Sequence, residues 1–102
     1  MKPLIFYSEA KLELDSAMSW YEHRLIGLGL EFHDKVEIAL ERIRGNAEIG
    51  TPYKSTEYRF LRTTRFPYLL FYLDLQDAIW IATVAHSRRR PDYWKRRIPE
   101  LE

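Results

Sequence analysis

Two helical patterns joined by only three residues constrain the fold of this chain more than any other feature of its sequence. Apolar residues recur at helical spacing before and after the segment Gly27-Leu28-Gly29, whose glycines tolerate positive φ angles. Helices with so short a connection lie roughly antiparallel, and each has one apolar face to bury. The pair therefore requires a flat apolar partner elsewhere in the chain. The apolar positions are Ala10, Leu14, Ala17, Met18, Tyr21 and Leu25, then Leu28, Phe32, Val36, Ala39, Leu40 and Ile43.

The second half of the sequence supplies that partner. Three runs rich in β-branched and aromatic residues, 58–63, 66–73 and 78–86, are separated by connections short enough for antiparallel hairpins. A further short strand over residues 4–7 ends at Ser8, which we expect to cap the first helix. The order β-α-α-β-β-β predicts one α+β domain over residues 1–102, with an N-terminal strand and an antiparallel helical hairpin packed on a mostly antiparallel sheet.

Composition excludes several classes of protein. A chain of 102 residues forms one modest core, which disfavours a deep cavity for a large cofactor. The absence of cysteine excludes disulfides, thiolate metal sites and cysteine nucleophiles. No stretch approaches the roughly 18 apolar residues of a membrane span, and the first residues do not form a signal-peptide pattern. We therefore expect a cytoplasmic protein without a cofactor or membrane partner.

Charge is distributed unevenly along the chain. Residues 1–51 contain six Lys or Arg against nine Asp or Glu, whereas residues 52–102 contain ten against six. Eight of the eleven arginines lie in the second half, and a guanidinium suits bidentate contacts with phosphate or carboxylate. The acidic side chains of the two helices are expected to form solvated faces. A polyanion or an acidic partner is expected to meet the C-terminal half.

The predicted sheet carries several candidate binding arginines. Arg59 and Arg62 project to opposite faces of one strand because their separation is odd, and Arg65 follows in the hairpin. One interpretation is that they form weak surface ion pairs. The other is that those on the uncovered face bind phosphate.

The strand over 78–86 ends in a basic and aromatic segment. His86 either acts as a general base or simply packs the strand end. The segment after it pairs cations with stacking surfaces, as in proteins that bind single-stranded nucleic acid. Tyr93 either deprotonates a ribose hydroxyl or anchors the tail, and we favour anchoring for Trp94. The cations are Arg88, Arg89 and Arg90. Neither His23 nor His33 has the spacing of a metal site, so no metal is expected.

Short motifs follow these elements in order along nearly the whole chain, and in order and spacing they resemble toxins of the RelE/ParE superfamily. These toxins come from bacterial type II toxin–antitoxin modules and are often called plasmid stabilisation proteins. The motifs are Ala10-Lys11-Leu12-Glu13-Leu14, Trp20-Tyr21-Glu22, residues 27–32, residues 39–43 with Asn46, Tyr58-Arg59, residues 65–72, residues 84–89 and Pro91-Asp92-Tyr93-Trp94.

The resemblance implies a small toxin that a cognate antitoxin neutralises. RelE-like members cleave mRNA on the ribosome without a metal. In that reading, which is our primary expectation, His86 or Tyr93 activates the ribose 2′-hydroxyl while Arg59 and Arg89 stabilise the charge on the phosphate. The residues expected to bind RNA or a partner are Lys54, Arg62, Arg65, Arg88 and Arg90. Lys54 is the one lysine in the loop where cleaving relatives tend to carry several.

Two alternatives remain open at this point. ParE-like members poison DNA gyrase and need no catalytic groups, so the basic C-terminal half would then be a docking surface. A relative that has lost toxicity would persist only as a partner of the antitoxin.

Overall fold

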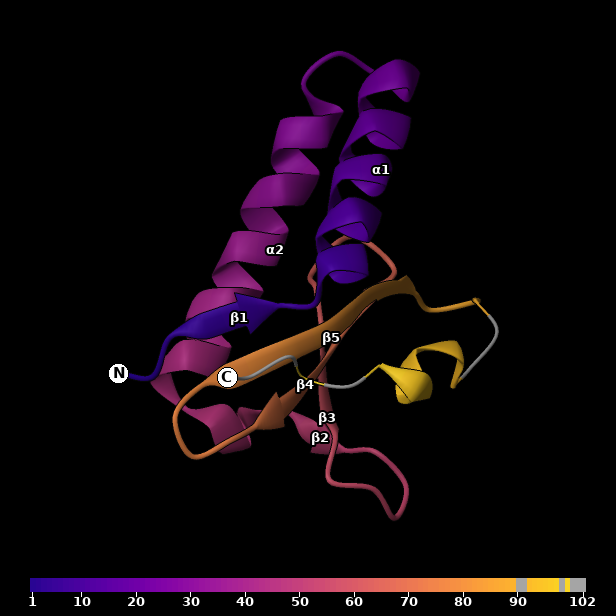
Figure 1. Ribbon diagram of the computed structural model, residues 1–102. Coiled ribbons are helices and arrows are strands. Elements are labelled where there is room, and N and C mark those ends of the chain that lie inside the picture. The colour runs from indigo at the N-terminus through magenta and orange to yellow at the C-terminus, as the bar shows by residue number, and fades with distance from the viewer. Residues whose placement is uncertain (90–91, 98, 100–102) are drawn as a thin grey trace.

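The two helices form the predicted antiparallel hairpin. The computed structural model describes residues 1–89, 92–97 and 99, with α1 at Ser8–Arg24 and α2 at Leu28–Gly45 (Figure 1). Gly27 has a φ of 90°, which a residue with a side chain rarely adopts. A Cβ on Gly29 would lie 2.6 Å from the Met18 carbonyl oxygen, so this glycine permits the close approach of the helices. The Glu22 carboxylate accepts hydrogen bonds from both glycine amides and fixes the turn.

Within the described part of the chain, five strands form one sheet in the order β1-β5-β4-β3-β2. Neighbouring strands pair antiparallel, except that β1 runs parallel to β5. The strands are β1 (Leu4–Phe6), β2 (Thr51–Pro52), β3 (Arg59–Arg62), β4 (Tyr68–Asp74) and β5 (Ile79–His86), and two short 3-10 helices are η1 (Ala47–Ile49) and η2 (Tyr93–Arg96).

The helices cover one face of the sheet, which we call the inner face. Leu14 of α1 and Phe32 of α2 pack there against Leu70 and Ile81 in the larger of two apolar clusters. Tyr72 of β4 is also fully buried in this cluster. Most of the core therefore lies between the hairpin and the two long strands.

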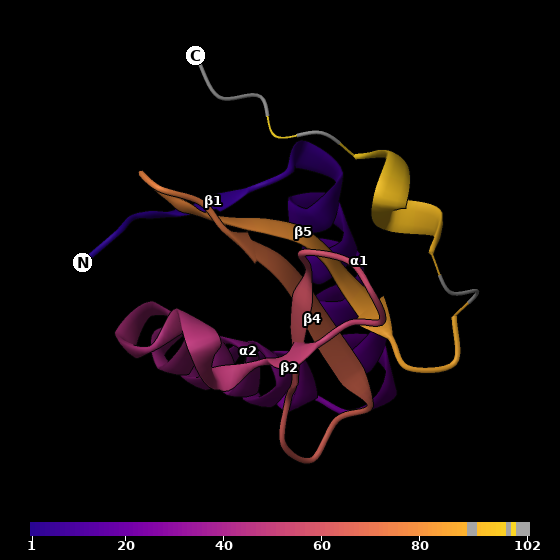
Figure 2. The ribbon, with the colours of Figure 1, turned by 90° about the horizontal axis from the view of Figure 1, so that it is seen from below.

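The opposite, outer face is covered by the C-terminal segment (Figure 2). Trp94 of η2 is 1% exposed and lies 4.4 Å from Phe71, measured between ring centroids. Tyr53 and Tyr58, from the loop before β3, pack against the same indole. The expectation that Trp94 anchors the tail is thus confirmed.

A β-bulge lies in the middle of β5. Phe71 pairs with Thr83 while Tyr72 pairs with Ile81, so Ala82 is the extra residue. Ala82 and Thr83 both turn toward the outer face, and Val84 returns to the inner cluster. The bulge therefore changes which face the last residues of β5 present.

The α+β class, the hairpin and the mostly antiparallel sheet agree with the sequence prediction. Three details differ. Tyr7, not Ser8, occupies the N-cap position of α1, and no side chain caps that helix. Leu25 lies beyond the end of α1 and is 61% exposed, because the hairpin turn carries it away from the core. The loop 46–57 contains β2 and η1, which the sequence did not predict. Among the described residues, no helix is long and apolar enough to cross a membrane.

Candidate functional site

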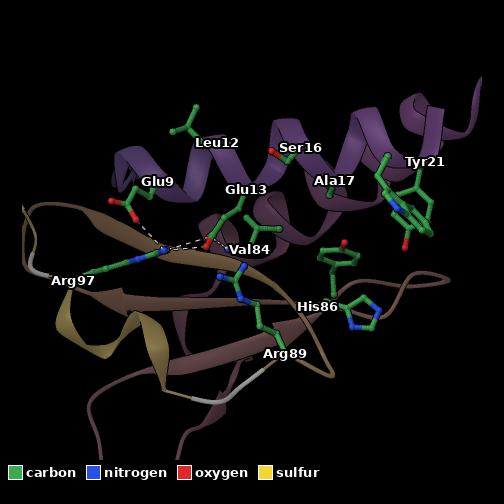
Figure 3. A pocket seen from close by; sticks show the side chains of 12 residues that line it. Glu9, Leu12, Glu13, Ser16, Ala17, Tyr21, Val84, His86, Arg89 and Arg97 are labelled. Carbon is green, nitrogen blue, oxygen red and sulfur yellow. Dashed lines mark hydrogen bonds and ion pairs between the residues drawn. The ribbon is translucent and has the colours of Figure 1, made fainter. Parts of the chain in front are cut away.

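Three of the four candidate catalytic residues lie together where β5 ends (Figure 3 labels His86 and Arg89). His86 is the last residue of β5, and its Nδ1 atom accepts a hydrogen bond from the Arg88 amide at 3.0 Å. The Arg89 guanidinium stacks 4.0 Å from the centroid of the Tyr93 ring. The turn after β5 and the start of η2 therefore bring a histidine, an arginine and a tyrosine to one place.

The Tyr93 hydroxyl is held in a hydrogen-bonded group that we call the Glu13 network, consisting of Glu13, Thr83, Tyr93 and Arg97. The hydroxyl lies 2.7 Å from the Thr83 hydroxyl and 3.1 Å from a Glu13 carboxylate oxygen. Arg97 donates to both Glu13 oxygens, at 3.1 and 2.9 Å. The Glu13 and Arg97 side chains are only 14% and 9% exposed. This is a largely buried ion pair with its polar partners in place.

The network shifts the protonation of its members. Burial alone would raise the pKa of Glu13, but hydrogen bonds from Arg97, Thr83 and the Val84 amide outweigh it and lower that pKa. Burial raises the pKa of Tyr93 above its ordinary value of 10.0. At neutral pH Glu13 is therefore charged and Tyr93 carries its proton.

Arg59, the fourth candidate catalytic residue, lies elsewhere. It pairs with Tyr72, an inner-face residue, and its Nη1 atom donates to the Glu48 and Gly50 carbonyls at 3.2 and 2.8 Å. The guanidinium thus ties β3 to the segment after α2. Tyr93, by contrast, packs with the outer-face cluster, so the sheet separates the two side chains.

The expected binding residues that the structure describes are all exposed, and they differ in whether they form an ion pair. Lys54 forms an ion pair with Asp92 at 3.4 Å, and Arg65 forms one with Glu31. Arg62 and Arg88 are exposed and form no ion pair with any described residue. Arg90 lies outside the described residues.

Two hollows meet at His86 and Arg89, which line both. The larger, of about 750 Å³, lies between α1 and the end of β5 (Figure 3). The smaller, of about 190 Å³, lies on the outer face and has aromatic walls from Tyr53, Phe71 and Trp94. Within residues 1–89, 92–97 and 99, no cluster of three or more His, Asp or Glu side chains has the arrangement of a metal site.

Comparison with known proteins places this architecture in a family. Residues 4–91 match the family model described as the ParE toxin of the type II toxin–antitoxin system parDE. The chain belongs to the ParE toxin family. A solved structure described as the chromosomal ParDE TA system from P. aeruginosa is similar in fold, with a TM-score of 0.73 and 21% sequence identity over 84% of this chain and 96% of that one. The search of curated proteins gave no match.

In this ParE family toxin the Glu13 network contains residues to which sequence reasoning gave no role. Glu13 was expected on a solvated face but is largely buried, and Thr83 and Arg97 had no assigned role. Glu13 lies three residues after Ala10 and four before Ala17, on the buried stripe of α1. An acidic residue on an apolar stripe is the signal that points to a buried partner. Nothing comparable marks Thr83 or Arg97 in the sequence.

Proposed function

We propose that this toxin arrests growth by binding DNA gyrase through a basic surface at the end of β5, without a catalytic group of its own. The observation that carries the proposal is that Arg59 and the Tyr93 hydroxyl, half of the candidate catalytic set, are each held in internal hydrogen bonds, Arg59 beside β2 and the Tyr93 hydroxyl at the edge of β5. Membership of the ParE toxin family supports the same conclusion, because ParE-like members poison gyrase.

The protonation of Tyr93 also favours docking over catalysis. A general base must accept a proton near neutral pH, and the raised pKa keeps the phenol protonated. Its oxygen already contacts Thr83 and Glu13 within the buried network. The most direct structural role for Tyr93 is to fasten η2 to β5.

The proposed docking surface consists of Arg62, His86, Arg88 and Arg89. Arg62 lies on the outer face, because it pairs with Leu69 of the outer cluster. His86 pairs with Tyr68 of the inner cluster, but it stands at the end of β5 and lines both hollows. None of the three arginines forms an ion pair with a described residue, so each retains its charge for a partner. Such clusters speed the encounter with an oppositely charged surface and make binding sensitive to salt.

The proposal is tested by separating the two targets with purified components. One reaction contains the toxin, DNA gyrase and supercoiled plasmid, and the other contains the toxin with ribosomes translating a defined mRNA. We expect trapped gyrase–DNA breaks in the first and intact mRNA in the second. Codon-positioned mRNA cuts with no gyrase breaks would overturn the proposal in favour of ribonuclease activity, and a protein inactive in both would overturn it in favour of a non-toxic antitoxin partner.

Two variants then distinguish docking from catalysis. The double variant Arg88→Ala, Arg89→Ala removes two charges of the proposed surface and should weaken gyrase poisoning at least tenfold. The double variant Arg42→Ala, Arg44→Ala in the last turn of α2 removes the same number of charges and should not. Tyr93→Phe removes only the hydroxyl. Circular dichroism checks that the variant folds. The variant should retain gyrase poisoning, whereas an activity that depended on the phenol as a catalytic group would be lost.

A further inference from the structure

The three arginines of the proposed docking surface differ in how their side chains are held. Arg62 and Arg88 are exposed, and their side chains make no hydrogen bond, ion pair or cation–π contact with any described residue. Arg89 is exposed too, but its guanidinium lies over the Tyr93 ring, 4.0 Å from the ring centroid. Within the described part of the chain, Arg89 is therefore the arginine of this surface whose charged group is held in place.

Hydrogen bonds also fix the backbone of the turn that carries Arg89. The Ser87 amide donates to the Pro67 carbonyl at 2.8 Å. The Arg88 amide donates to Nδ1 of His86, and the Arg89 amide donates to the His86 carbonyl, both at 3.0 Å. Three successive amides are thus satisfied within the protein, so the backbone of Arg89 has a defined position beside the end of β5.

The Tyr93 ring that holds Arg89 is itself attached to the core in two ways. Its hydroxyl contacts the Thr83 hydroxyl at 2.7 Å and the Glu13 carboxylate at 3.1 Å. Thr83 is 0% exposed, and Glu13 also accepts a hydrogen bond from the Val84 amide of β5. The ring packs against the apolar cluster of the outer face. The contact with Arg89 is therefore built on a ring that β5, α1 and the outer cluster keep in place.

A side chain that is already in place loses less freedom when a partner binds. Arg88 must be ordered on binding, whereas the Arg89 guanidinium has a partner ring in the free protein. A guanidinium and a carboxylate are both flat, and they form two parallel hydrogen bonds when their planes and directions agree. A phosphate is also bound well by the point charge of a lysine, which has no plane to fix. A guanidinium held in place thus favours a carboxylate as its partner.

We propose that Arg89 determines the specificity of the docking surface by a bidentate contact with a carboxylate of gyrase, and that Tyr93 is its positioning residue. Arg62 and Arg88 contribute attraction at longer range through their charge. The role belongs to the Tyr93 ring and not to its hydroxyl. This inference deepens the proposed function and rests on it.

Charge-preserving variants test the role of Arg89. Arg89→Lys keeps the charge but loses the flat fork, and it should weaken binding of the purified toxin to DNA-free gyrase by about tenfold, mainly through faster dissociation. Arg88→Lys makes the same change one residue earlier and should weaken binding by only about twofold. Arg44→Lys, in the last turn of α2, is the control outside the surface and should bind like wild type. Equal losses in the Arg88 and Arg89 variants would overturn the proposal.

Variants of Tyr93 test its positioning role. Tyr93→Leu removes the ring and should weaken gyrase binding about as much as Arg89→Lys, whereas Tyr93→Phe keeps the ring and should restore wild-type binding. In the double variant Arg89→Lys, Tyr93→Leu the two losses should not add, because both changes remove the same contact. Additive losses would show that Tyr93 affects binding through the fold and not through Arg89, and would overturn its positioning role. Thermal melts check that each variant folds.

Nuclear magnetic resonance tests the stacking without the target. The ring current of Tyr93 should shift the side-chain proton signals of Arg89 upfield in wild type and in Tyr93→Phe, but not in Tyr93→Leu. The Arg88 signals should stay unshifted in all three proteins. Unshifted Arg89 signals in wild type would overturn the positioning role, whatever the target of the toxin.

The binding assay separates a failure of this inference from a failure of the proposed function. A wild-type toxin that did not bind gyrase at all would overturn the proposed function and, with it, the contact assigned to Arg89. Wild-type binding that Arg89→Lys left unchanged would overturn this inference alone. Binding that appeared only after DNA was added would assign Arg89 to a phosphate and would overturn the carboxylate contact.

Discussion

The two faces of the sheet are covered in different ways. The inner face lies under two helices of 17 and 18 residues, with fully buried Phe32, Val36 and Ile43 along α2. The outer face is covered by a four-residue 3-10 helix and a loop. Trp94 is the buried residue of that 3-10 helix, and the Glu13 network holds the same segment through Tyr93 and Arg97.

Because of this difference, the two covers of the sheet should not open with the same ease. A helical face distributes its apolar contacts over many residues, so that no short segment can leave without unfolding the core. The outer cover depends on one indole and one ion pair, and it lies beside the proposed docking surface. We therefore expect the outer layer to open locally while the inner layer unfolds only with the whole domain.

The largest effect is expected at the inner face. Phe32 is 0% exposed and contacts the rings of Tyr21, Phe66 and Tyr68. Phe32→Ala should lower the free energy of unfolding by about 4 kcal/mol, the loss typical of a buried aromatic replaced by alanine. Urea denaturation should show one transition shifted to lower urea for both backbone and aromatic signals. A variant that lost only local structure would contradict the assignment of this layer to the global core.

At the outer face, Trp94→Ala should cost about 3 kcal/mol, near the low end for such a replacement because η2 can detach instead of leaving a cavity. Hydrogen exchange of the Lys95 and Arg97 amides, which bond back to Asp92 and Trp94, should accelerate far more than exchange in β4. Trp20→Ala, at a 53% exposed position, is the matched control and should leave those amides unchanged. Equal acceleration across the sheet would show that the two layers are one cooperative unit.

The ion pair that fastens the outer layer gives a smaller, pH-dependent effect. Glu13→Gln keeps the shape but leaves the Arg97 guanidinium only the exposed Glu9 carboxylate, at 3.4 Å, as a charged partner. It should cost about 2 kcal/mol at pH 7, less than breaking a fully buried pair, because Glu9 and the Ala82 carbonyl still contact Arg97. The folded-state pKa of Glu13 is lowered, so its contribution is complete above the ordinary value of 4.5 and is lost as pH falls through the folded-state pKa. Denaturation curves of the two proteins should therefore converge below about pH 4.5. A stability difference that stays constant into acid would mean that the carboxylate charge is not what holds the segment.

The sequence predicted the inner layer of the fold but not the network that holds the outer layer. The hairpin and the long strands follow from local periodicity, because each pattern is contained within one segment. The Glu13 network joins residues from α1, β5 and the C-terminal segment, and it depends on the bulge at Ala82 and on a positive φ of 72° at Asp92, a non-glycine residue. No local pattern encodes either feature.

The sequence also predicted the proximity of some candidate site residues and not of others. His86, Arg89 and Tyr93 lie close together because they follow one strand within eight residues. Arg59 was grouped with them by family resemblance, and its position depends on β2 and η1, two elements too short to be recognised from sequence. The parallel pairing of β1 with the first residues of β5 likewise arises only when the N-terminal strand meets a strand far along the chain.

The smallest effect expected is at the point where the inner face meets the loop after α2. The buried Tyr72 hydroxyl donates to the Ala47 carbonyl at 2.7 Å and accepts from the Gly50 amide at 2.9 Å. Tyr72→Phe keeps the ring in the core but removes both bonds, and should cost about 1 kcal/mol because a neighbouring carbonyl and amide lose their partner. The variant should melt a few degrees lower, and the 47–50 segment should exchange faster while α1 and η2 stay unchanged. If exchange in η2 also became faster, the two faces would be coupled through β4. The inner and outer layers would then not open independently.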